Sequence, residues 1–206
     1  MIAVVTNLAA AAGAIGAMVT SWCLVKKPDI SMSLNGALAG LVAITAGCDV
    51  IAPTWAIVTG LAAGILVVFS IRFFERMAID DPVGAISVHG VCGAWGTLAI
   101  GLFAADKGLV LGYGASQLGI QALGVLAAMA WVLPVSFAIF YAIKWTAGLR
   151  VTADEELQGL DISEHGLAAY HHEDPAFMTQ AASGTSTTNG VAIAMTQDSI
   201  LQRRLT

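Results

Sequence analysis

Five long stretches without a charged residue constrain this chain more than any other feature. They cover residues 1–25, 30–48, 50–71, 82–105 and 108–143. A helix needs about 20 apolar residues to cross a hydrocarbon core that is about 30 Å thick. Composition agrees, because only 11% of the residues are charged and the mean hydropathy is +0.79, whereas an ordinary soluble domain is roughly 25% charged. The sequence therefore predicts an all-α, multi-pass integral membrane protein.

We expect a transmembrane helical domain over residues 1–148. The last charge-free stretch is too long for one upright helix, and Gly112-Tyr113-Gly114 near its start is typical of a loop. Pro134 predicts a kink, which membrane helices tolerate where neighbouring groups satisfy the freed carbonyl. The five expected helices run over residues of about 2–25, 31–49, 52–73, 82–105 and 117–145.

Basic residues gather in every second loop, which predicts the orientation. Cytoplasmic loops of membrane proteins carry an excess of lysine and arginine. Here the loops after the first, third and fifth helices contain Lys26, Lys27, Arg72, Arg76, Lys144 and Arg150. The alternate loops contain only Lys107. We therefore expect an outside N-terminus and a cytoplasmic C-terminus, in a plasma or inner membrane.

Small residues and cysteines predict packing rather than metal chemistry. Gly36 and Gly40, like Gly60 and Gly64, have the spacing that lets membrane helices approach closely. The three cysteines have no Cys-x-x-Cys spacing, so they indicate neither a disulfide framework nor a zinc site. The adjacent pair at residues 171–172 is two histidines in a polar tail, which suits solvent exposure better than zinc coordination. We expect no metal, no cofactor and no nucleic-acid partner.

His89 is the one ionisable imidazole in the stretch 82–105, which contains no Asp, Glu, Lys or Arg. At 1.5 Å per helical residue it lies about 10 Å beyond Pro82, inside the bilayer. An ionisable group at that depth usually faces a protein interior or an aqueous path, and so marks a site. Ala85 lies one turn earlier on the same face and is a candidate pore residue with it. The alternative is a core histidine bonded to a backbone carbonyl.

Asp80 and Asp81 directly precede Pro82, which predicts a helix N-terminus. A carboxylate there accepts hydrogen bonds from unpaired backbone amides, and a proline at the first helical position needs no donor. We assign both acids to capping. Because no second catalytic group accompanies His89, and the sequence contains neither a Walker loop nor a nucleophile elbow, we do not expect an enzyme.

The chain changes character after Arg150. Residues 152–156 are polar and acidic, and residues 159–166 form a compact stretch with two glycines. From about residue 178 the sequence is rich in Ser, Thr, Gly and Ala. We expect a cytoplasmic segment at 149–174 and a disordered tail at 175–206.

Four separated stretches resemble the ammonium transporter/methylammonium permease/Rhesus family. Together they resemble the family's seventh, eighth and tenth helices and its cytoplasmic C-terminal region, in the family's order. They lie at residues 6–12, 36–45, 80–93 and 149–170.

This resemblance implies the last five helices of an eleven-helix transporter built from two inverted repeats, and hence a fragment of a homotrimeric channel for ammonium or ammonia. His89 resembles the second of the family's two pore histidines, which relay a proton while ammonia crosses. No position here matches the first pore histidine. Thr45 resembles a pore-side threonine of the eighth helix; the alternative is a hydroxyl bonded to its own helix.

The resemblance also implies a regulatory role for residues 149–174. In the family this segment lies against the cytoplasmic face, touches the adjacent subunit and transmits regulation. The matching positions are Gly159, Asp161, Ser163, His165 and Gly166. A nitrogen-regulatory protein of the PII type is the implied partner. The alternative function is a membrane sensor or interaction component that keeps the trimer and regulator contacts without conducting.

Overall fold

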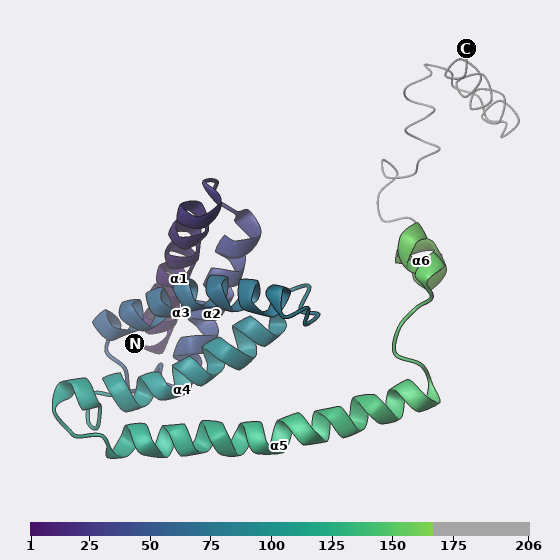
Figure 1. The fold of residues 1–206 in the computed structure, drawn as a ribbon. Coiled ribbons are helices and arrows are strands. Elements are labelled where there is room, and N and C mark those ends of the chain that lie inside the picture. Colours follow the sequence, from purple (N-terminus) through teal and green to yellow (C-terminus); the bar gives the residue numbers. More distant parts are fainter. Residues whose placement is uncertain (167–206) are drawn as a thin grey trace, which may run out of the picture. The chain divides into compact units, whose positions relative to one another are not determined.

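The computed structural model describes residues 1–166, which form helices and turns and fall into two compact units, residues 1–137 and residues 138 onward. The expected disordered tail at 175–206 and the end of the expected regulatory segment, 167–174, lie outside the described residues. In Figure 1 the first four α-helices gather in one bundle. The elements are α1 (Ile2–Val25), α2 (Ile30–Thr45), α3 (Pro53–Arg76), η1 (Ile86–Val91), α4 (Cys92–Phe103), η2 (Leu109–Leu111), α5 (Ser116–Thr146), α6 (Ala153–Gln158) and α7 (Leu160–His165).

Two helix boundaries differ from the sequence-based expectation. The second helix ends at Thr45 rather than at 49, because the chain turns at Gly47, whose carbonyl accepts the N–H of Ile51. The fourth helix begins at Ile86 rather than at Pro82, because residues 82–83 form a turn. Among the described residues, four helices are long and apolar enough to cross a membrane, and α2, with 16 residues, is shorter. A fifth crossing therefore stays a prediction.

Helices α1 and α3 run parallel and touch through their backbones. A Cβ added to Gly60 would meet the carbonyl oxygen of Ala9, and one added to Gly64 would meet that of Gly13. Along this contact the residue numbers of both helices increase in the same direction, so the two helices are parallel. This confirms the close approach that the spacing of Gly60 and Gly64 predicts.

Helix α2 runs antiparallel to α1, and its contact is equally close. A Cβ on Gly40 would meet the Ala9 carbonyl oxygen, whereas one on Gly36 would meet the side chain of Ala17. Ala9 therefore lies against glycines of two helices at once. In a membrane, where no hydrophobic effect drives helices together, this backbone contact supplies the packing energy.

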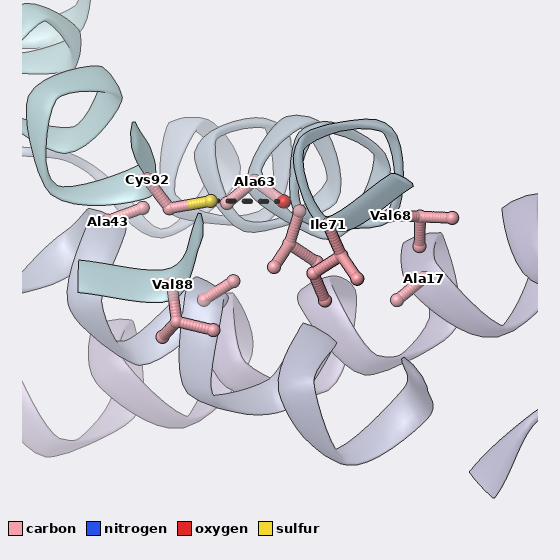
Figure 2. Packing of buried hydrophobic residues seen from close by; sticks show 9 residues of the cluster. Ala17, Ala43, Ala63, Val68, Ile71, Val88 and Cys92 are labelled. Carbon is pink, nitrogen blue, oxygen red and sulfur yellow. Dashed lines mark hydrogen bonds between the residues drawn. The ribbon is translucent and has the colours of Figure 1, made fainter. Parts of the chain in front are cut away.

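Helix α4 completes the alternation by running antiparallel to α3. The Trp95 Nε1–H donates to the Thr59 carbonyl at 3.0 Å, and the Cys92 thiol lies 3.6 Å from the Ala63 carbonyl (Figure 2). Earlier residues of α4 thus meet later residues of α3. Chain direction therefore alternates from α1 to α4, as successive membrane crossings require.

Small and medium apolar side chains fill the bundle. The cluster drawn in Figure 2 comes from α1, α2, α3, η1 and α4, and every buried side-chain polar atom of the described residues has a hydrogen-bond partner. The cluster consists of Ala17, Ala39, Ala43, Ala63, Val67, Val68, Ile71, Val88 and Cys92. In contrast, none of the 31 residues of α5 is buried.

The second unit contains a capping box at the start of α6. The Thr152 hydroxyl accepts the Glu155 N–H at 3.3 Å, and the Glu155 carboxylate accepts the Thr152 N–H at 2.9 Å. These reciprocal bonds satisfy amides that the first helical turn leaves unpaired.

Candidate functional site

His89 lies on η1, a six-residue π-helical turn that leads directly into α4. The Cys92 N–H donates to the Ser87 carbonyl, which is the i to i−5 bond of a π-helix. Ser87 and Val88 are buried on one side of the segment, whereas His89 and Gly90 are exposed on the other. π-Helical turns within α-helices are frequent at functional sites. The imidazole is thus displayed on an outer face of the bundle rather than in its core.

Asp81 anchors the start of η1. Its Oδ1 accepts the Ile86 N–H at 3.0 Å, and its Oδ2 accepts the Ser87 N–H and the Ser87 hydroxyl, each at 3.3 Å. The carboxylate reaches these amides across the turn that follows it. Asp80 lies exposed directly before it. The expected cap on a helix beginning at Pro82 is replaced by a cap on a helix beginning four residues later.

A buried serine pair, which sequence reasoning missed, joins η1 to α3. The Ser70 hydroxyl donates to the Ser87 hydroxyl at 3.0 Å, with both side chains buried. Serines within charge-free stretches were the available signal. The sequence alone gives no register between the two helices, so it could not pair them.

Thr45 and Ala85 are both exposed, on different elements. The Thr45 hydroxyl donates to the Leu41 carbonyl of its own helix at 2.7 Å, which is the alternative considered above. Ala85 directly precedes η1. Because α2 and α4 run parallel, with Ala43 of α2 against Gly96, Thr45 lies about two helical turns beyond His89 along the bundle. The structure brings Ala85 near His89 but places Thr45 at another depth.

The predicted regulatory residues lie on α6, α7 and their ends. Gly159 follows α6 with a φ of 89°, and Gly166 follows α7 with a φ of 68°; both values favour glycine. Asp161 and His165 lie in the first and last turns of α7. The Ser163 hydroxyl donates to the Leu160 carbonyl at 3.4 Å. These five positions therefore occupy one short stretch of the second unit.

Metal binding finds no support in residues 1–166, where no three His, Cys, Asp or Glu side chains come close enough to hold an ion.

Comparison with known proteins supplies the family. A sequence profile for the Ammonium Transporter Family matches residues 1–170. Ammonium transporter Amt2 of Archaeoglobus fulgidus is 42% identical over 176 residues, which cover 80% of this chain and 38% of that protein. A putative ammonium transporter of Synechocystis, sll1017, is 42% identical over 168 residues, with coverage of 81% and 36%.

Solved structures agree with the sequence matches. A structure titled Sensor Amt Protein superimposes with a TM-score of 0.73 at 39% identity, covering 80% of this chain and 42% of that chain. Mep2 of Candida albicans superimposes with a TM-score of 0.69 at 31% identity, with coverage of 85% and 42%. This chain thus spans about two-fifths of the length of the relatives that it matches. It belongs to the ammonium transporter family.

Proposed function

We propose that this chain supplies the C-terminal part of a transmembrane path for ammonium or ammonia, with His89 as a pore group. The observation that carries the proposal is the exposed imidazole on η1, within a bundle that belongs to the ammonium transporter family. Relatives are more than twice as long, so a further part of the path is supplied by helices outside this chain.

Imidazole suits a site that must separate ammonium from potassium, a cation of similar size. A neutral imidazole has one N–H donor and one acceptor nitrogen. The acceptor can take a proton from ammonium, whereas potassium has none to give. An apolar passage makes a bare ion costly to carry. We therefore propose that His89 aids deprotonation and relays the proton to a second histidine outside this chain.

The orientation is part of the proposal. Since α1 and α3 are parallel, their C-terminal ends lie at the same end of the bundle, and the chain carries Lys26, Lys27, Arg72 and Arg76 there. The positive-inside rule makes this end cytoplasmic. Lys144 and Arg150 at the start of the second unit make it cytoplasmic by the same rule, and a homotrimer and a PII-type regulator are the proposed partners of its regulatory residues.

A chimera tests the pore role of His89. Residues 1–170 would replace the aligned part of Archaeoglobus Amt2, and methylammonium uptake would be measured in a host that lacks ammonium uptake. We expect His89→Ala to abolish uptake at unchanged protein level. Leu126→Ala, on an exposed position of α5, is the control and should transport normally. Full uptake by the His89 variant would refute the pore role.

A non-conducting sensor is the second candidate. It is favoured by the structural likeness to a protein titled Sensor Amt Protein and by the separate unit that carries α6 and α7. For a sensor we expect that the chimera assembles and binds a PII-type protein but does not take up methylammonium. If deleting residues 149–172 changed neither assembly nor regulator binding, the sensor proposal would fail.

A further inference from the structure

The orientation of His89 depends on its neighbours rather than on its own ring. Within residues 1–166 no hydrogen bond holds the imidazole, while Ser87, two residues earlier, is fully buried and bonded on two sides. We infer that Ser70 on α3 is a positioning residue for His89, acting through Ser87 and Asp81. This inference rests on the proposed function only for its effect on transport, because the geometry can be tested without transport.

The three side chains form a directional hydrogen-bond chain. An ionised carboxylate only accepts, so the one proton of the Ser87 hydroxyl is donated to Asp81 Oδ2 at 3.3 Å. The oxygen of Ser87 is then left to accept the Ser70 proton at 3.0 Å. Ser70 is therefore the only member on α3, and it ties the start of η1 to that helix.

Burial shields the Ser70 to Ser87 hydrogen bond from water. Ser70 is 7% exposed and Ser87 is fully buried, so water cannot replace a lost hydroxyl. Without the Ser70 hydroxyl, Ser87 keeps its bond to Asp81 but loses its hydrogen bond to α3. We expect η1 then to shift against α3, and His89 to shift with it.

Packing at the beginning of η1 limits other movements. Gly84, with a φ of 73°, ends the turn after Asp81 and would bring an added Cβ to 3.2 Å from Ile71 and 3.3 Å from Asn35. Its carbonyl accepts the Val88 N–H at 2.8 Å. Asn35 of α2 and Ile71 of α3 therefore confine the turn before η1. The Ser70 to Ser87 bond holds the next part of the segment, η1 itself, to α3.

Chemical modification of the full 206-residue chain in liposomes tests the geometry. The rate of carbethoxylation of His89 by diethyl pyrocarbonate would be measured by peptide mapping, with exposed His165 as the internal reference. We expect Ser70→Ala to change the His89 rate about fivefold, the effect of one hydrogen bond. Ser70→Thr keeps a hydroxyl at this position, and His89 in this variant should react at the same rate as in the native chain.

Ser21→Ala is the matched control. Ser21 is a buried serine on α1 whose hydroxyl donates to Met18 of its own helix, so its loss should leave His89 unchanged. If Ser70→Ala failed to insert, Ser70→Cys would make the same comparison at similar volume with a weaker donor. Equal His89 rates in the Ser70 and Ser21 variants would overturn the inference.

Transport by the chimera separates this inference from the pore proposal. We expect Ser70→Ala to lower the maximal methylammonium uptake rate about fivefold with little change in KM, and Ser70→Thr to restore it. Normal uptake by His89→Ala would refute the pore role but leave the modification result standing. Loss of uptake in His89→Ala, together with an unchanged His89 modification rate in Ser70→Ala, would refute the positioning role alone.

Discussion

Helices α3 and α5 have the same mean hydropathy over their most apolar windows, 2.2, yet they differ in packing. Buried residues make up 44% of this apolar stretch in α3 and none of it in α5. Hydropathy therefore indicates whether a segment can enter a bilayer, but it does not indicate what the segment contacts there. The difference lies in where the small residues are and what faces them.

Glycines show the contrast most directly. A Cβ on Gly64 of α3 would meet the Gly13 carbonyl oxygen, whereas one on Gly124 of α5 would have no heavy atom within 4 Å among the contacts of the described chain. Both residues sit in long apolar helices. Only the first makes the close backbone contact that membrane helices need for association.

The largest effect should come from filling such a contact. Gly64→Leu should lower the free energy of unfolding in detergent by about 3 kcal/mol, because the side chain must displace the α1 backbone. Gly124→Leu should change it little. Thermal unfolding followed by circular dichroism compares the two. Equal losses would mean that α5 is packed as tightly as α3.

A cavity should have a smaller effect. Val67 on α3 is fully buried, whereas Val132 on α5 is 54% exposed. Val67→Ala should cost about 2 kcal/mol through lost contacts, and Val132→Ala almost nothing. Denaturant titration of both variants in the same detergent measures the difference. A cost at Val132 as large as that at Val67 would contradict the comparison.

The loss of one hydrogen bond at a tryptophan should have a smaller effect on stability than the cavity. The Trp95 indole donates to the Thr59 carbonyl of α3, while Trp131 of α5 is 71% exposed. Trp95→Phe should lose about 1 kcal/mol, the contribution of one hydrogen bond. Trp131→Phe should be neutral in the same thermal assay. If Trp95→Phe were neutral too, the bond between α3 and α4 would not contribute to stability.

The smallest effect is local and lies in α6, which belongs to the second unit. Hydrogen bonds from the backbone and side chain of Thr152 lower the pKa of Glu155 below its usual 4.5. A carboxyl with a lowered pKa stabilises the fold above the unfolded value, and the contribution is lost as pH falls through the folded pKa. The α6 amide shifts in NMR should therefore change as the pH drops below 4.5.

Variants of the capping box give the control for that titration. Thr152→Ala should move the Glu155 midpoint up toward its usual value, whereas Glu156→Gln should leave it in place. A Glu155 midpoint that did not respond to Thr152→Ala would refute the cap as its cause. Either outcome should leave the thermal unfolding of α1 to α4 unchanged.

The sequence predicted the packed glycines and the helical class, because both depend on local spacing. It did not predict the early end of α2 or the late start of η1. The first depends on a turn packed against Ile100, and the second on a carboxylate that reaches past a turn to Ile86. The pairing of Ser70 with Ser87, which lie 17 positions apart in the sequence, depends on the register between α3 and η1. Such registers arise from tertiary packing, which single-sequence patterns do not contain.

The alternating helix directions give the three native cysteines a practical use. Cys23 is exposed near the end of α1, and because α2 returns along α1, the partly buried Cys48 lies at the opposite end of the bundle. Cys92 is buried between them. An impermeant maleimide added to one face of sealed vesicles should therefore label Cys23 and, added to the other, Cys48. The unaltered chain can thus report which way it is inserted.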